Sequence, residues 1–307
     1  MLTSFFGKST PVNVIAVAIF MTAFFVFANF DALFVNFELL PFIEKLAVLA
    51  VFLLSVMVLN FIAKKNELTK RSAYKILLFA VFATSFPALL KNDQAIIANL
   101  FVLLSFRRII SLKSRKVVQQ KIFDATFWIC IASLYYFWSI LFLLVVFAGI
   151  LSYASYFKNF LIPIIAFLAV ALITEAAHLL IYESLYSFSD WFQPMNFQFE
   201  NYQDLALLVP LSIILALLIW TMLFYLSVIQ KASITRRPVL NLVMLSLTTA
   251  ICVAVLSHNK NGSEFIFFFV PLSIIASNYF GNKKDRIFKE ILLILLILMP
   301  FCIPFIF

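Results

Sequence analysis

The sequence has few charged residues for its length. Only 12% of its 307 residues are Asp, Glu, Lys or Arg, whereas 64% are hydrophobic. A soluble domain could not cover its surface with so few charges, but a multi-pass helical membrane protein exposes apolar side chains to lipid. Long unbroken apolar runs also exclude an outer-membrane barrel, whose strands alternate apolar and polar residues. The composition therefore predicts an all-α polytopic membrane protein.

Cysteine, histidine and glycine are also scarce. The three cysteines, Cys130, Cys252 and Cys302, lie inside apolar runs, so we expect packing residues without a disulfide framework. Two histidines, His178 and His258, are too few for a typical zinc or iron site, and we predict no metal and no cofactor. Four glycines and no internal repeat argue against a transporter built from two related halves with broken helices.

Nine apolar runs are long enough to span a membrane: 12–29, 46–63, 75–90, 95–112, 160–182, 205–229, 239–257, 265–280 and 288–307. A further run at 125–157 is too long for one span and short for two, at ~1.5 Å per helical residue. We predict a short or re-entrant helix pair there, with a bend near Tyr135–Trp138. An even number of crossings keeps the later basic loops, at 231–237 and 283–289, on the same side as the earlier ones.

The positive charge fixes an orientation for this arrangement. The net charge is +9, yet Lys and Arg occupy short loops between apolar runs and form no basic domain that would bind nucleic acid. With the N-terminus inside, every Lys and Arg except Lys45, Lys91 and Lys260 falls on the inner side. We expect a single transmembrane domain, 1–307, with ten to eleven membrane segments, its C-terminus outside, in a bacterial inner membrane.

Two outer loops combine acidic and aromatic residues, Phe30–Lys45 and Glu183–Asp204. Segments of this kind tend to lie as interfacial helices on the membrane surface. On the inner side, a basic stretch follows the fourth span and includes Arg107, Arg108 and Lys113. Contact with anionic lipid and control of topology explain that stretch without a partner.

Glu175 is the only carboxylate within a predicted span, and His178 and Tyr182 share its helical face. An ionisable residue in a span is a functional hypothesis, because an unpaired charge there is costly. Glu175 and His178 could relay protons in a proton-coupled transporter. The structural alternative is that Glu175 reaches interfacial water or pairs with His178.

Two outer carboxylates are candidate catalytic residues. Asp31 directly follows the first span, and Asp93 lies in the tight outer turn Lys91-Asn92-Asp93-Gln94. A carboxylate at the outer mouth of a membrane cavity can act as a general base or bind a cation. The alternative is that each is a solvated loop acid.

The three outer cations, Lys45, Lys91 and Lys260, could hold a lipid phosphate or pyrophosphate, since Lys binds phosphate as a point charge. The alternative for two of them is local pairing. Glu44 adjoins Lys45, and Asp93 lies near Lys91.

Several stretches resemble an uncharacterised family of multi-pass inner-membrane proteins from Bacteroidota. They are Met1–Pro11, Leu90–Asp93, Lys121–Trp128 and Tyr136–Phe142. The resemblance covers most of the chain and implies a membrane habitat, with no agreed activity. Some relatives carry a label of carotene-cleaving oxygenase, which two histidines cannot support because it implies a multi-histidine iron site.

The chain is more distantly similar to polytopic glycosyltransferases that use polyprenyl-phosphate sugars. Asp31 in the first outer loop and the broken run at 125–157 carry this likeness, although Asp31 stands alone and no soluble outer domain is present. The likeness implies sugar transfer in cell-envelope biogenesis, with Asp31 or Asp93 deprotonating the acceptor and Lys91 or Lys260 holding the lipid phosphate.

The alternative function is a non-catalytic subunit or assembly factor of a larger inner-membrane complex for secretion, motility or envelope building. The lack of a soluble domain and of a clear catalytic motif favours it. The expected partners are therefore membrane lipids, a polyprenyl-phosphate-linked sugar, or other inner-membrane proteins.

Overall fold

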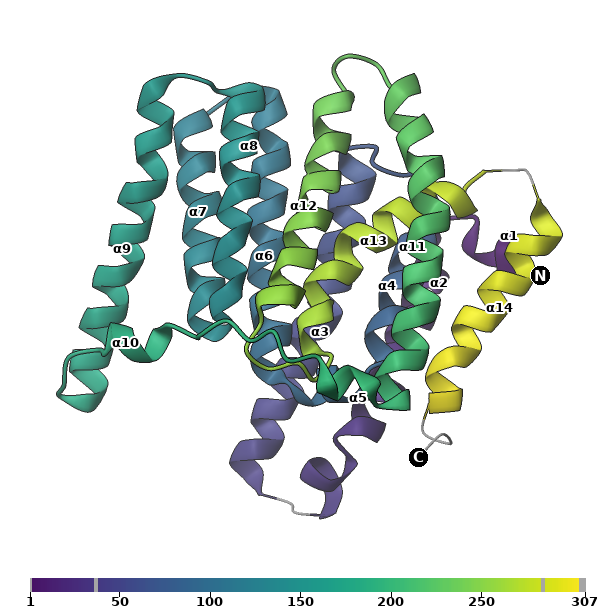
Figure 1. Ribbon diagram of the computed structural model, residues 1–307, viewed down its shortest axis with the longest axis horizontal. Helices are drawn as coiled ribbons and strands as arrows, with labels where there is room; N and C mark the ends of the chain where they lie inside the picture. The colour runs from purple at the N-terminus through teal and green to yellow at the C-terminus, as the bar shows by residue number, and fades with distance from the viewer. Residues whose placement is uncertain (1, 36–37, 283–284, 304–307) are drawn as a thin grey trace.

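The structure, a computed structural model, describes residues 2–35, 38–282 and 285–303, and every regular element in these ranges is helical (Figure 1). Within them, seven helical segments are long and apolar enough to cross a membrane. They are α2 (Pro11–Ala28), α3 (Leu39–Lys65), α6 (Asp93–Ser111) with η2 (Leu112–Ser114), α9 (Phe157–Tyr182), α11 (Leu205–Lys231), α12 (Arg237–Leu256), and η5 (Ser263–Phe265) with α13 (Ile266–Phe280). The chain is therefore an all-helical membrane protein.

The remaining helices are shorter or less apolar. They are α1 (Leu2–Phe6), η1 (Asp31–Val35), α4 (Tyr74–Thr84), α5 (Pro87–Lys91), α7 (Val118–Tyr135), η3 (Phe137–Phe142), α8 (Leu143–Tyr153), α10 (Phe188–Trp191), η4 (Glu200–Gln203) and α14 (Arg286–Cys302). The predicted last span corresponds to α14, but its final residues, 304–307, lie outside the described residues, as do Lys283 and Lys284 of the preceding basic loop.

Two helices form the centre of the bundle. Every residue of α4 and of α13 is buried, and the two helices pack against each other, with α13 running obliquely through the bundle (Figure 1). Lipid can solvate an apolar helix, but here neighbouring helices and not lipid cover α4 and α13. By contrast, α9 lies at one edge and is the least buried of the seven spanning-length helices (Figure 1).

The predicted continuous span at 75–90 is wrong, because the helix breaks before Pro87. A proline ring disfavours helical backbone at the preceding residue, and Phe86 is accordingly extended, with φ −123° and ψ 94°. Helix α4 therefore ends at Thr84, and α5 begins at Pro87, where the missing proline N–H would have no helical partner.

The predicted break in the 125–157 run is confirmed. Helix α7 ends at Tyr135, Tyr136 is extended, and η3 starts at Phe137 and continues into α8. The first helix of the pair begins earlier than predicted, at Val118, because it includes the polar residues that precede the apolar run. The first helix of the pair is consequently longer than the apolar run alone suggests, whereas the second ends at Tyr153, before the end of the run.

Neither predicted interfacial helix forms as expected. Helix α3 starts at Leu39 and takes up the end of the first outer loop, whose residues 36–37 lie outside the described residues. Residues 183–204, here called the strap, contain only the short turns α10 and η4 in a mainly extended segment. The strap crosses one end of the bundle, from the edge helix α9 to α11 (Figure 1).

Candidate functional site at the strap end

A cleft of about 670 Å³ lies at the strap end of the bundle and combines polar and apolar walls. We call it the strap-side cleft. Its polar lining residues are Asp31, Thr84, Lys91, Asn201, Asp204, Lys260 and Asn261, and its apolar residues include Phe24, Phe27, Leu90, Leu207, Pro300 and Ile303. Three residues that the sequence singled out, Asp31, Lys91 and Lys260, therefore lie in one cleft.

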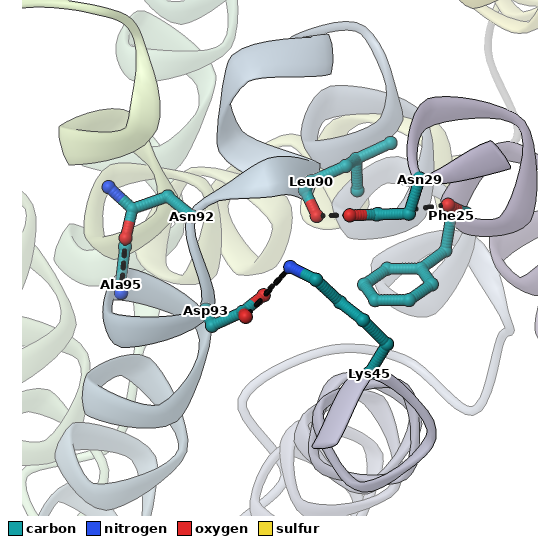
Figure 2. Close-up of polar contacts among 7 residues, drawn as sticks. All are labelled: Phe25, Asn29, Lys45, Leu90, Asn92, Asp93 and Ala95. Atoms are coloured by element: carbon teal, nitrogen blue, oxygen red, sulfur yellow. Dashed lines mark hydrogen bonds and ion pairs between the residues drawn. The ribbon is translucent and has the colours of Figure 1, made fainter. Parts of the chain in front are cut away.

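Asn29 brings the ends of α2 and α5 together. Its buried side-chain amide donates hydrogen bonds to the carbonyl oxygens of Phe25 and Leu90, both at 3.0 Å (Figure 2). Asp31 lies two residues after Asn29 and Lys91 one residue after Leu90, and both side chains are exposed. The amide of Asn29 thus places a carboxylate and an ammonium group, sixty positions apart, on one cleft.

The junction between α5 and α6 is fixed by Asn92. Its Oδ1 accepts a hydrogen bond from the backbone N–H of Ala95 at 3.0 Å and so caps α6 (Figure 2). Its Nδ2 donates to Oγ of Ser263 at 2.9 Å, which joins this junction to the start of η5. Lys91 therefore lies in a turn held from both sides.

Asp93 and Lys45 pair with each other and do not line the strap-side cleft. The Nζ of Lys45 lies 2.7 Å from both carboxylate oxygens of Asp93, the first residue of α6 (Figure 2). The alternative of local pairing therefore holds for Lys45 with a different partner, Asp93 instead of Glu44, and the pairing of Lys91 with Asp93 is wrong. An acid in the first turn of α6 is also favoured by the helix dipole.

Lys260 lines the cleft but is only 2% exposed. Its ammonium group donates to the carbonyl oxygens of Ala254 at 3.1 Å and Val255 at 2.7 Å, in the last turn of α12, and lies 4.5 Å from the ring centre of Phe199. Burial lowers the pKa of Lys260, and the nearby Glu264 carboxylate opposes that shift. The cation is thus largely occupied with neutralising a helix end.

Glu264 is a functional candidate that the sequence analysis missed. It is fully buried, and it is the one buried carboxylate in the described part of the chain. Its Oε2 accepts from the backbone N–H of Gly262 at 3.0 Å, and its Oε1 accepts from the phenol of Tyr202 in the strap. Its position directly before the apolar run at 265–280 was the available signal.

The same end of the bundle also holds a buried pair of hydroxyl groups, those of Tyr136 and Ser257. Tyr136, in the break after α7, lies with its Oη 2.6 Å from Oγ of Ser257. The Oγ of Ser257 in turn donates to the carbonyl oxygen of Asn259 at 3.0 Å. These bonds and those of Glu264 hold the turn between α12 and η5, which carries Lys260 into the cleft.

Glu175 and His178 lie away from the cleft, on the edge helix α9. The Oε1 of Glu175 accepts from the backbone N–H of Tyr186 at 3.3 Å, and Nδ1 of His178 lies 2.8 Å from the carbonyl oxygen of Ser184. Their hydrogen bonds thus go to separate backbone groups of the strap, so the two side chains hold the strap's first turn. Oε2 of Glu175 has no hydrogen-bond partner among the described residues.

The described residues include no group of three or more His, Cys, Asp or Glu side chains placed to hold a metal ion. What the strap-side cleft offers is two exposed carboxylates, those of Asp31 and Asp204, one exposed ammonium group, that of Lys91, and an adjoining apolar wall. Such a lining suits an amphiphile that carries a charged head group.

The helices and this cleft define the class, an all-helical integral membrane protein with a mixed polar and apolar cleft at one end. The chain belongs to a family of unknown function, DUF6427, which matches residues 7–306. The predicted resemblance to an uncharacterised family is thereby confirmed. No curated protein and no solved structure matches the chain.

Proposed function

We propose that the chain crosses a bacterial inner membrane, as in Bacteroidota, in ten to eleven segments, with its N-terminus inside and its C-terminus outside. The basic loops around residues 65, 113 and 236 converge at the end of the bundle opposite the strap. Lys and Arg in short loops mark the inner side of a membrane, so this convergence supports the orientation. The strap end, with Asp31 and Glu264, then faces the periplasm.

In this orientation, the strap-side cleft would serve cell-envelope biogenesis by transferring a sugar from a polyprenyl-phosphate carrier. The observation that carries the proposal is the shared cleft of Asp31 and Lys91, with an apolar wall beside them. Phe24, Phe27 and Leu90 would contact the isoprenoid chain, while the ammonium group of Lys91 would hold the phosphate.

The transfer assigns one role to Asp31 and one to Lys91. Asp31 takes the proton of the acceptor hydroxyl while that oxygen attacks the anomeric carbon of the sugar. The bond between the anomeric carbon and the phosphate oxygen breaks, and the lipid phosphate leaves as an anion beside Lys91. Asp93 is less suited to the role of base, because Lys45 occupies both of its oxygens.

The test compares Asp31→Asn with Glu38→Gln in the native membrane. Glu38 is an exposed acid of the same segment that does not line the cleft, so it matches the charge change. We expect Asp31→Asn to abolish one periplasmic glycan at an unchanged protein level, and Glu38→Gln to leave all glycans intact.

Unchanged glycans in Asp31→Asn would refute the transferase. Purification in mild detergent, with mass spectrometry of what co-purifies, adds a second readout. A polyprenyl-linked sugar retained by the wild type supports the proposal. A stoichiometric protein partner without such a lipid would instead support the non-catalytic subunit.

A further inference from the structure

A second cleft has a volume of about 700 Å³. We call it the basic cleft. The turn between α11 and α12, which contributes to its lining, lies at the end of the bundle opposite the strap (Figure 1). The cleft is lined by the end of α3, by η2 with the adjoining turns of α6 and α7, and by the turn between α11 and α12. Its cationic lining residues in the described part of the chain are Lys65, Arg107, Arg108, Lys113, Lys121 and Arg236, opposed by the carboxylate of Glu67.

Specific contacts hold the walls of the basic cleft in place. The guanidinium of Arg236 donates to the carbonyl oxygen of Glu67, which ties the α11–α12 turn to the end of α3. Nζ of Lys121 donates to the carbonyl oxygen of Ser111 at 2.9 Å and so holds the start of α7 against the end of α6. The cleft is therefore built by contacts between segments that are far apart in the sequence.

Most of these cations lack an anionic partner. Arg108 pairs with Asp124 at 3.0 Å, and no other lining cation forms an ion pair among the described residues. Lys113 is exposed, and its side chain makes no hydrogen bond among the described residues. Nε of Arg236 is buried without a hydrogen-bond partner among those residues. Like charges gathered in one cleft raise each other's energy, and a bound anion offsets that repulsion.

Membrane orientation alone does not account for this arrangement. The positive-inside rule requires Lys and Arg on one side of the membrane, but it does not require three loops to converge around one cavity. Arg107 also lies over the ring of Phe61, 4.8 Å from its centre, and Lys65 flanks the same ring at 5.3 Å. The guanidinium of Arg107 is thereby oriented at the cleft wall.

We propose that the basic cleft binds phosphate groups, either those of a soluble polyphosphate or that of the head group of an anionic lipid. Arginine presents a planar set of donors that matches phosphate oxygens, and lysine adds a point charge. Arg107 and Lys113 are exposed and therefore accessible to an incoming anion. The site is separate from the strap-side cleft and does not depend on sugar transfer.

The test uses the full-length protein in detergent and two double variants. Arg107→Gln with Lys113→Gln removes two charges from the cleft, and Arg115→Gln with Lys116→Gln removes two exposed charges that do not line it. Both double variants remove two positive charges from the same basic stretch, so they should affect the orientation of the protein in the membrane equally. Lys113→Gln alone, at an exposed position without hydrogen bonds, guards against loss of folding in the double variant.

Binding of tripolyphosphate is measured by calorimetry, and retention of phosphatidylglycerol is measured by native mass spectrometry after purification from vesicles of phosphatidylglycerol and phosphatidylcholine. We expect the cleft double to weaken wild-type binding by about tenfold or more, with a smaller loss in Lys113→Gln. The control double should change it by less than about twofold.

Tripolyphosphate binding without lipid assigns the site to a soluble phosphate. Selective retention of phosphatidylglycerol without tripolyphosphate binding assigns it to a lipid head group. Failure of the wild type to bind either probe, or an equal loss in both doubles, would overturn the proposal.

Discussion

Tyr202 donates a hydrogen bond from its phenol to Oε1 of Glu264. This bond attaches the strap to η5, the buried turn that directly precedes α13. The two residues are far apart in the sequence. Tyr202 belongs to η4, which has no buried residue, and Glu264 belongs to η5, in which every residue is buried. The contact explains how a mainly extended segment keeps a fixed place across the helices.

Tyr202→Phe should destabilise the protein, because it leaves Oε1 of Glu264 buried without that donor. We expect a loss of about 1–3 kcal/mol in the free energy of unfolding, seen as a lower Tm in detergent. The ring contacts with Phe199 and Phe265 remain available to phenylalanine. Tyr156→Phe, at an exposed position, is the control and should leave the Tm unchanged. Equal Tm values for Tyr202→Phe and wild type would contradict the assigned role.

The same contact predicts a dependence on alkaline pH. Burial and the adjacent Glu264 carboxylate raise the pKa of Tyr202 above its ordinary value of about 10. Above that value the unfolded chain loses the phenolic proton while the folded chain keeps it, so this contribution to stability falls as pH rises. The Tm difference between wild type and Tyr202→Phe should therefore shrink between about pH 8 and about pH 11.

Lys260 contributes in the opposite direction, because burial lowers its pKa and the unfolded chain then binds the extra proton. Lys260 is present in both the wild type and Tyr202→Phe, so its contribution cancels in the difference between their Tm values. A Tm difference that stays constant over this pH range would show that folding does not raise the pKa of Tyr202.

Much of the helical framework could be predicted from the sequence, because apolar runs report where a helix can be solvated by lipid. The break near Tyr135 followed from the length of the apolar run together with charge parity. The break before Pro87 was missed because the apolar run continues through it, although the effect of proline on Phe86 was a local signal. The start of α3 was missed because Glu44 and Lys45 resemble a loop, whereas Lys45 is neutralised by Asp93.

The candidate site was predictable only in part. Asp31 and Lys91 stood out as isolated charges on the outer side, but the bond from Asn29 to Leu90 that brings them together joins distant segments. Glu175 attracted attention as a lone carboxylate in a span, yet α9 lies at the edge of the bundle. The more deeply buried acid, Glu264, sits at the boundary of an apolar run, where composition distinguishes poorly between loop and core.

Gly262→Ala should destabilise the turn that carries Lys260. Gly262 has φ +95°, and an added Cβ would lie 2.9 Å from Cδ2 of Leu207 and 3.1 Å from Cδ1 of Phe86. The positive φ alone costs an L-residue about 1–2 kcal/mol, so the Tm should fall. Gly281→Ala, at φ −69°, adds a methyl group without that backbone cost and should lower the Tm less. An equal effect of the two substitutions would remove the conformational argument.

Lys45 and Asp93 should show a measurable but modest coupling. Their side chains are 17% and 34% exposed, so solvent screens the ion pair, and we expect a coupling energy of about 0.5–1 kcal/mol. Lys45→Gln, Asp93→Asn and the double variant form the cycle, read as the free energy of unfolding in detergent. The ion pair of Arg108 and Asp124, with side chains 43% and 35% exposed, provides a comparison at the other end of the bundle and should couple less strongly. If the effects of Lys45→Gln and Asp93→Asn are simply additive, the ion pair does not hold α3 against α6, and packing between the two helices must do so.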